Sequence, residues 1–409
     1  MVEPIIFSLK NGIRVVHQPL DREVAHCGLL IGAGSRDEQE HEHGLAHFLE
    51  HSLFKGTKKR KTFHILSRLD AVGGELNAFT AKEETWIHGS YLVEHYERAI
   101  ELIADIAFNS TFPSKEIIKE KEVILDEINS YKDSPAEMIF EDFDALLFKN
   151  HPVGRSILGT EESLRKLGTR NLIDFRNRTF TPENLIFSSA GRIDIQKLKD
   201  LLEKYIGHYK LNTSSLNRVR FKGYKPFNKT EIKDIHQVHY VMGTKAYDYH
   251  HKKRPGLSLL NNILGGPALN NRLSLNIREK HGIAYHIDST YAPFTDTGVF
   301  SIYLGTDKNN LAKSQDLIWK ELNILRNQPL STRQLHEAKK QIIAQIALAQ
   351  DSGGAIMFNL GKSLLLFDRI DSIADIIKKV DEISASHLMD IANETFDPKK
   401  MSSLTYSYK

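Results

Sequence analysis

The spacing of apolar residues changes along the first half of the chain, from the period of a strand to that of a helix. Apolar and polar residues alternate at 13–17 and again at 25–31, and this alternation predicts two β-strands. A turn-rich stretch at 32–36 follows. Apolar residues then recur every three or four positions, which predicts a helix that begins near Gly44. Its apolar side is formed by Leu45, Phe48, Leu49 and Leu53.

Three further helices are predicted in the first half, at 63–72, 92–109 and 115–130. The last of them has Ser114 as its expected N-cap and an acidic residue, Glu116, in its first turn. Its isoleucines would pack it onto a neighbouring element.

The order of elements begins again in the second half of the chain. A polar stretch at 211–217 carries no periodicity, and with the basic run up to Lys229 it is the predicted interdomain linker. After it, strands are predicted at 237–242 and 299–304 and helices at 256–264 and 332–350. Strands mixed with helices in both halves indicate an α+β chain built as a two-domain pseudo-repeat. The predicted bounds are 1–212 for the first domain, 213–230 for the linker and 231–409 for the second domain.

Segments of the two halves support the pseudo-repeat. Residues 44–51 match 256–263, and residues 121–128 match 339–346, in the positions of their apolar side chains. The polar side chains do not recur: His47, Glu50, His51 and Glu127 are replaced by Leu259, Asn262, Ile263 and Gln345. An apolar frame that is kept without its polar residues indicates one chemically active half and one supporting half.

Composition limits the class of protein. A length of 409 residues favours two domains, and 41% hydrophobic and 26% charged residues are typical of a globular protein. The formal net charge of +3 argues against a dedicated nucleic-acid binder, which usually has a strong basic bias.

The single cysteine and the amino terminus bear on the expected location. Cys27 is the only cysteine, so no intrachain disulfide can form, a reducing compartment is expected, and the residue is predicted to be buried in the strand at 25–31. Residues 1–8 do not resemble a signal peptide, and no window of about 18 apolar residues predicts a membrane span. The expected location is the cytoplasm, although a signal peptide already removed would leave the same sequence.

The helix near Gly44 carries the strongest candidate chemistry, the motif His47-Phe48-Leu49-Glu50-His51. Positions i, i+3 and i+4 share one helix face, so His47, Glu50 and His51 point the same way. Two imidazoles one turn apart can reach one zinc ion, because zinc–nitrogen bonds are about 2.0–2.1 Å long, and Glu50 could then accept a proton from a water molecule beside the metal. An exposed helix that carries histidines by chance is the alternative interpretation. A third ligand decides between the two.

The residues around this motif resemble the pitrilysin, insulinase and mitochondrial-processing-peptidase family. The resemblance covers Gly34-Ser35-Arg36-Asp37-Glu38 and then Gly44 through Gly56-Thr57, and His-x-x-Glu-His is the inverted-zincin signature. In that family the third zinc ligand is a glutamate about 76 residues after the second histidine, in a Val-Ile-x-x-Glu segment. Here 51 + 76 leads to Glu127, in Val123-Ile124-Leu125-Asp126-Glu127. The resemblance further implies that Glu120 supports the metal ligands without binding the metal itself.

The resemblance extends over nearly the whole chain and implies further site residues. The segment 73–80 is similar to an edge strand of the family, in which Asn77 and Ala78 would contact the substrate backbone. Arg278 and Tyr285 are similar to a pair that would hold the substrate and stabilise the oxyanion. Without the resemblance, 73–80 would be interpreted as a tight turn, Arg278 as a surface ion pair with Glu279, and Tyr285 as a half-buried core ring.

The implied function is that of a zinc metalloendopeptidase with one Zn²⁺ per chain, in which Glu50 is the general base. The implied fold is two α/β-roll domains of the LuxS/metallohydrolase-like type, and two such chains would pair as a clamshell dimer around a closed chamber. The expected substrate is an unfolded or short peptide, and the partner is a second copy of this chain or a related chain. A non-catalytic partner or scaffold subunit of a processing-peptidase-like complex is the alternative, because the same fold serves that role.

Two departures from the family pattern are visible. Ser52 stands where many members have methionine, which is expected to affect packing rather than chemistry. The glycine-rich loop of the processing subunits is reduced here to residues 264–268, which weakens any expectation of presequence recognition. The physiological substrate is left open by the sequence.

Overall fold

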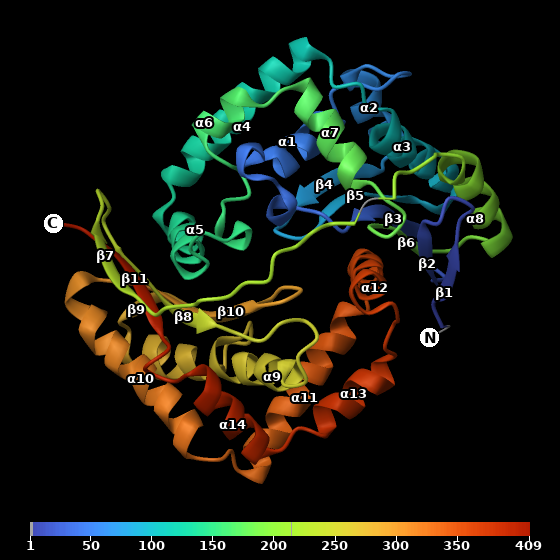
Figure 1. Cartoon of the computed structure of the whole chain (residues 1–409). Coiled ribbons are helices and arrows are strands. Elements are labelled where there is room, and N and C mark those ends of the chain that lie inside the picture. Colours follow the sequence, from blue (N-terminus) through green and yellow to red (C-terminus); the bar gives the residue numbers. More distant parts are fainter. Residues whose placement is uncertain (1–2, 214) are drawn as a thin grey trace. The chain divides into compact units, whose positions relative to one another are not determined.

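The computed structural model describes residues 3–213 and 215–409 (Figure 1). Residues 1 and 2, and residue 214 of the predicted linker, lie outside the described residues. The chain divides into two compact units, each made of three separate stretches of sequence. Unit 1 holds the described residues up to Asn129 together with Arg155–Arg218 and Leu348–Ile370, and unit 2 holds Ser130–Gly154, Val219–Ala347 and Asp371–Lys409.

Unit 1 is built on a six-stranded sheet with the strand order β1-β2-β6-β3-β5-β4. Strands β2 and β6 run parallel and the other neighbours run antiparallel. The order leaves β4 at one edge of the sheet. The strands are β1 (Ile5–Ser8), β2 (Arg14–Pro19), β3 (Val24–Ile31), β4 (Glu75–Thr80), β5 (Thr85–Leu92) and β6 (Leu185–Gly191).

Helices cover both faces of this sheet. On one face a large apolar core holds Ala25, Cys27, Leu29 and Ile31 of β3 together with α1 (Leu45–Leu53) and α3 (Tyr96–Asn109). On the other face Leu30 and its neighbours pack against α12 (Gly353–Phe367). Residues 29–31 are therefore apolar without alternation because each face of β3 is buried. The remaining helices of this unit are α2 (Thr62–Asp70), α4 (Ser114–Lys132), α6 (Glu161–Lys166), α7 (Thr169–Thr179) and α8 (Ile195–Leu202).

Unit 2 repeats this layout with a five-stranded sheet in the order β7-β11-β8-β10-β9. Helices α9, α10 and α14 pack on one face, and α5 packs on the other through Ile139, Phe143 and Leu147. Its strands are β7 (Asn228–Ile232), β8 (Val238–Lys245), β9 (Ala284–Pro293), β10 (Gly298–Thr306) and β11 (Ser402–Ser407). Its helices are α5 (Pro135–Leu147), α9 (Arg254–Gly265), α10 (Leu311–Asn327), α11 (Thr332–Ala349), α13 (Ile373–Asp381) and α14 (Ala385–Thr395).

The two halves of the chain exchange one helix each. Helix α12 comes from the second half of the sequence but packs on the sheet of unit 1, and α5 comes from the first half but packs on the sheet of unit 2. Both helices have an apolar side, so each sheet is covered on its second face by a helix that is distant in sequence. The two sheets of similar layout confirm the α+β class and the pseudo-repeat. The division at 212 and 230 stays a prediction.

Most predicted elements are confirmed, with shifts at their ends. The helix predicted at 92–109 begins later, because Leu92 still belongs to β5 and a short 3₁₀ turn precedes α3. Ser114 is the first residue of α4 rather than its cap, and the Pro113 carbonyl accepts the amide of Glu116 at 2.9 Å. Cys27 is buried, as predicted. The 3₁₀ segments are η1 (Ser35–Asp37), η2 (Glu40–Glu42), η3 (Val93–His95), η4 (Pro152–Gly154) and η7 (Lys308–Asn310), and the π segments are η5 (Glu203–Gly207) and η6 (Ser274–Glu279).

Within the described residues, every helix is too short or too polar to pass through a lipid bilayer.

A close backbone contact sets the start of α1. Gly44 is its N-cap with φ +90°, and it lies against Gly159 from the loop before α6. A Cβ on Gly44 would lie 2.7 Å from the Leu158 carbonyl oxygen, and a Cβ on Gly159 would lie 2.7 Å from the Gly44 Cα. Neither position has room for a side chain, so backbone packing holds the first turn of α1 in place.

Gly44→Ala is expected to lower the free energy of unfolding by about 2–5 kcal/mol, because left-handed backbone strain and overpacking add together. Gly73→Ala is the matched control. Gly73 also has a left-handed φ of +73°, but a Cβ there would have no neighbour within 4 Å. The control should lose only about 1–2 kcal/mol from backbone strain. Urea unfolding followed by circular dichroism measures both values, and equal losses would contradict the steric argument.

Candidate metal centre

Helix α1 presents His47, Glu50 and His51 from one face while its apolar face is buried in the core of unit 1. The carboxylate of Glu38 fixes the helix start, because its two oxygens accept the amides of Gly44 at 2.9 Å and Ala46 at 2.8 Å. These amides have no partner inside the helix, so the side chain satisfies them. The orientation of α1 is thus set by core packing at one side and by this cap at its beginning.

Helix α4 brings Glu127 to the two histidines. The Glu127 Oε2 atom lies 3.7 Å from His47 Nε2 and 3.6 Å from His51 Nε2. One ligand atom from each of the three residues lies within 4.8 Å of the others. Ligands of a tetrahedral zinc ion would be roughly 3.3 Å apart, given bonds of about 2.0–2.1 Å. The three side chains therefore fit a zinc ion with only a small contraction.

A chain of charged contacts holds the His51 ring. His51 Nδ1 lies 2.8 Å from Glu120 Oε1, and the Lys55 ammonium lies 2.5 Å from Glu120 Oε2. Burial raises the pKa of Glu120, but the contacts with His51 and Lys55 outweigh it and hold that pKa below its usual range. An ionised Glu120 accepts the Nδ1 proton, which leaves the Nε2 lone pair of His51 turned toward Glu127. This is the arrangement expected of a supporting glutamate.

His47 is held by burial instead of by a polar partner. Burial lowers the pKa of His47 to about 3, with a smaller contribution from His51, so the imidazole is neutral at neutral pH. Neutral imidazole is the form that binds metal. Its Nδ1 atom is buried and has no hydrogen-bond partner among the described residues. A ligand on Nε2 would require the proton on this Nδ1 atom.

Glu50 lies beside the cluster and is held from the sheet. Its Oε2 atom accepts a hydrogen bond from Thr80 Oγ1 at 2.8 Å. Burial raises the pKa of Glu50, while Thr80 and His51 oppose that shift. A carboxylate of raised basicity next to a metal position is suited to accept a proton.

The predicted substrate-contacting residues lie on an edge strand, as the resemblance implies. Asn77 and Ala78 belong to β4, which is at the end of the sheet order. The Ala78 amide donates to the Asn77 side-chain oxygen at 2.8 Å. The alternative interpretation as a tight turn applies to Gly73, whose φ is +73°, but the strand begins directly after the turn.

The predicted Arg/Tyr pair belongs to unit 2, whereas the histidines and glutamates of the site belong to unit 1. Arg278 Nε lies 2.9 Å from Glu279 Oε1, which is the ion pair of the alternative interpretation. The Tyr285 hydroxyl donates to Asp307 at 3.1 Å, and the residue is 64% exposed, so it is not a core ring.

The sequence did not single out Lys55 or Thr80. Lys55 follows His51 by four residues but lies beyond the end of α1 at Leu53, so the helix pattern of the motif does not predict its contact with Glu120. Thr80 is the last residue of the segment 73–80. Only the tertiary structure, in which β4 lies beside α1, shows that its side chain contacts Glu50.

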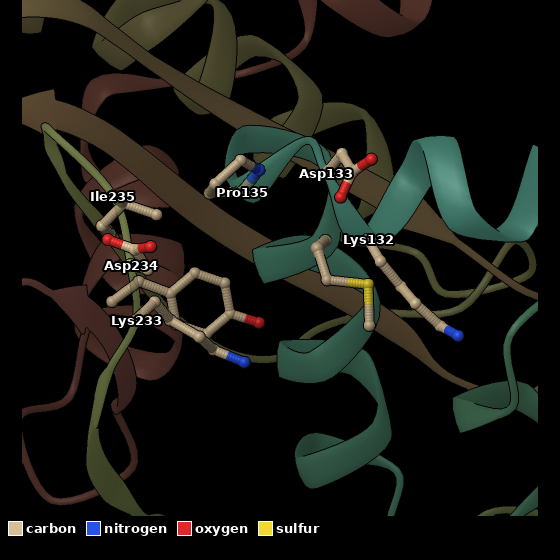
Figure 2. A pocket seen from close by; sticks show the side chains of 8 residues that line it. Lys132, Asp133, Pro135, Lys233, Asp234 and Ile235 are labelled. Carbon is tan, nitrogen blue, oxygen red and sulfur yellow. The ribbon is translucent and has the colours of Figure 1, made fainter.

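A separate pocket of about 250 Å³ lies in unit 2, at the turn between α4 and α5 (Figure 2). Figure 2 shows Asp133 and Pro135 at this turn and the segment of Lys233 and Ile235 across from it. The residues that line this pocket include none of the predicted site residues. They are Lys132, Asp133, Pro135, Met138, Lys233, Asp234, Ile235 and Tyr406.

Comparison with known proteins agrees with this geometry. Residues 14–161 match the family described as insulinase, peptidase family M16, and residues 167–342 match the peptidase M16 inactive domain. The two matches together cover most of the chain, and the His-His-Glu cluster lies within the first of them. The chain belongs to the insulinase family, peptidase family M16.

Several relatives match along nearly their whole length. An uncharacterized zinc protease of Bacillus subtilis, YmxG, is 33% identical over 394 residues, which cover 95% of each chain. An uncharacterized zinc protease of Mycobacterium leprae is 32% identical, covering 96% of this chain and 89% of that protein. Another from Rickettsia bellii is 31% identical, covering 98% and 96%.

Two solved structures show the same fold. A protease from Helicobacter pylori superposes with a TM-score of 0.93 at 23% identity, covering 100% of both chains. A peptidase M16 inactive domain structure from Pseudomonas fluorescens superposes with a TM-score of 0.90 at 19% identity, covering 100% of this chain and 98% of that one.

Alanine at His47, His51 or Glu127 should remove most bound zinc, because each substitution deletes one of the three ligand atoms. Glu120→Gln keeps all three and should lower zinc affinity only about 10–100-fold. Metal content of purified variants, measured by inductively coupled plasma mass spectrometry, checks both expectations. Full zinc occupancy in Glu127→Ala would remove Glu127 from the ligand set.

Proposed function

We propose that the chain is a zinc-dependent endopeptidase that cleaves unfolded or short peptides. The observation that carries the proposal is the cluster of His47, His51 and Glu127, with one ligand atom of each within 4.8 Å, and with Glu50 held beside it. Three protein ligands with an open fourth position are typical of catalytic zinc. The name zinc protease given to relatives at 31–33% identity supports the same conclusion.

In the proposed mechanism the metal activates the substrate and the water, and side chains of the protein transfer the proton and hold the reacting groups. When bound, zinc would polarise the peptide carbonyl and lower the pKa of a water molecule. Glu50 takes a proton from the attacking water, which its raised pKa favours, and then gives that proton to the leaving amine. Glu120 holds the His51 ring so that its Nε2 atom stays directed at the site. Arg278 and Tyr285 are proposed to stabilise the oxyanion and the substrate.

The substrate is proposed to bind by adding a strand to the edge of the unit 1 sheet. The Ala81 amide donates to the Glu84 carbonyl at 2.8 Å, just beyond the end of β4. Bonded and non-bonded pairs alternate along an antiparallel ladder, so the main-chain groups of Thr80 and Ala78 point away from β5. A peptide paired there would be held mainly through its backbone, which permits loose sequence selectivity.

A non-catalytic scaffold subunit is the competing function. Loss of a zinc ligand or of the general base would favour it, but His47, Glu50, His51 and Glu127 are all present and lie together. Zinc content together with hydrolysis of a quenched fluorescent peptide separates the two functions. Zinc-free protein without hydrolysis would favour the scaffold. The cytoplasmic location stays a prediction.

Glu50→Gln should abolish peptide hydrolysis, with a loss of at least about 10²–10⁴-fold in kcat, while zinc content stays nearly unchanged. The reason is that glutamine keeps the size of the side chain but cannot accept the proton, and the three ligands are untouched. Turnover of a quenched peptide and metal analysis on the same sample measure both. Loss of zinc, or substantial remaining activity, would refute the role given to Glu50.

The partner is proposed to be a second copy of this chain, in a homodimer with two equivalent sites. Two-fold symmetry is the commonest form of oligomer, and one chain carries both the zinc ligands and the Arg/Tyr pair. In such a dimer Arg278 and Tyr285 of one chain would serve the zinc site of the other. A heterodimer with a related chain is the alternative.

Mixing two inactive variants tests this arrangement. A Glu50→Gln chain and an Arg278→Ala, Tyr285→Phe chain should each be nearly inactive. After subunit exchange, one site of each mixed dimer is whole, so activity should partly return. Native mass spectrometry confirms the exchange. No recovery after confirmed exchange would mean that the pair acts within its own chain or not at all, and an active monomer would exclude the dimer model.

A further inference from the structure

Thr80 links the candidate general base to the candidate substrate strand by a hydrogen bond. It is the last residue of β4, and its Oγ1 atom donates to Glu50 Oε2 at 2.8 Å. The two residues are 30 positions apart in sequence and belong to different elements, β4 and α1. Figure 1 shows these two elements within unit 1.

This contact is the only hydrogen bond that the Glu50 carboxylate accepts within the described part of the chain. A glutamate has three rotatable side-chain bonds, and this hydrogen bond restricts the rotation of the Glu50 side chain. Without the hydroxyl of Thr80, the Glu50 side chain would lose this hydrogen bond and could adopt other rotamers.

The hydrogen bond also assigns different tasks to the two carboxylate oxygens. Oε2 is occupied by the Thr80 hydroxyl, so Oε1 is left for the attacking water. A base acts efficiently only when its oxygen lies within hydrogen-bond reach of the proton that it removes, about 2.6–3.2 Å. Fixing Oε2 therefore fixes the position of Oε1 as well.

The main-chain groups of Thr80 are placed to bind the peptide substrate. The amide and carbonyl of Thr80 point away from β5, toward the free edge on which a peptide strand would add. The residue that would bind the substrate backbone thus also holds the base by its side chain. If a peptide pairs with the main chain of Thr80, its position relative to the Glu50 carboxylate is set by this one residue.

We propose that Thr80 is a positioning residue that orients the Glu50 carboxylate relative to a peptide bound on β4. The inference rests on the proposed peptidase function, and it adds a residue that acts on the base and not on the metal. The hydroxyl is required, whereas the shape of the side chain is not.

Thr80→Val removes the hydroxyl and keeps the branched shape that suits a strand, and Thr80→Ser keeps the hydroxyl. Thr80→Val should lower kcat about 10–100-fold, the range seen when a supporting contact of a catalytic group is lost. KM should stay within about twofold, because the main chain that binds the substrate is unchanged. Zinc content should equal that of the wild type, and Thr80→Ser should retain activity within about threefold.

Thr85→Val is the matched control for a merely structural effect. Thr85 lies opposite Thr80 in the β4–β5 pair, and its hydroxyl donates to the Ala33 carbonyl at 2.9 Å, away from Glu50. This variant loses one threonine hydrogen bond from the same sheet, so its stability should fall while its kcat stays near that of the wild type. An equal loss of kcat in Thr80→Val and Thr85→Val would overturn the proposal.

A crystal structure of Thr80→Val supplies a measurement that does not depend on activity. The Glu50 carboxylate should leave its wild-type position in this variant and keep it in Thr80→Ser. A carboxylate that stays in place in Thr80→Val, or a Thr80→Ser enzyme as slow as Thr80→Val, would overturn the proposal. Failure of the wild type to cleave any peptide would instead refute the proposed function, and the Glu50 positions would still decide whether Thr80 orients that residue.

Discussion

The candidate site depends on the packing of one short helix, α1, against the core of unit 1. Leu45, Phe48 and Leu49 are buried in that core, which turns the opposite face toward α4. The Glu38 cap and the contact of Gly44 with Gly159 fix the first turn. Since the helix cannot rotate without exposing its apolar residues, the two histidines are held in place before any metal binds, and this is the preorganisation that a metal site needs.

Burial and charged neighbours determine the protonation and orientation of the two histidines. The two histidines meet different environments: His47 is kept neutral by burial, and His51 is held through Glu120 and Lys55. Burial lowers the pKa of His51, but the hydrogen bond to Glu120 and the nearby carboxylates Glu50 and Glu127 raise that pKa more strongly, so its overall shift is opposite to that of His47. The second half keeps the frame without this chemistry, since Leu259 is buried on α9 where α1 has His47.

Helix α5 packs on the sheet of unit 2 and helix α12 packs on the sheet of unit 1, so the two compact units do not coincide with the two halves of the sequence. Each sheet would otherwise expose an apolar face, and Trp86 and Leu30 of unit 1 would be uncovered without α12. The two halves of the sequence are therefore connected by the packing of α5 and α12 as well as by the polar linker. This packing also explains why each compact unit is made of three stretches of chain.

The sequence by itself determined the elements, the α+β class, the pseudo-repeat and the shared face of His47, Glu50 and His51, because these follow from local periodicity. Glu127, Glu120 and the edge strand came from a family resemblance, since no local pattern links Glu120 to His51, 69 positions earlier, or Thr80 to Glu50, 30 positions earlier. Only the tertiary structure showed that Glu127 meets the histidines, that Lys55 and Thr80 hold Glu120 and Glu50, and that α5 and α12 change places. These contacts depend on how segments that are distant in sequence pack together. The apolar pattern of a helix predicts that one face will be buried, but it does not identify the element that will cover that face.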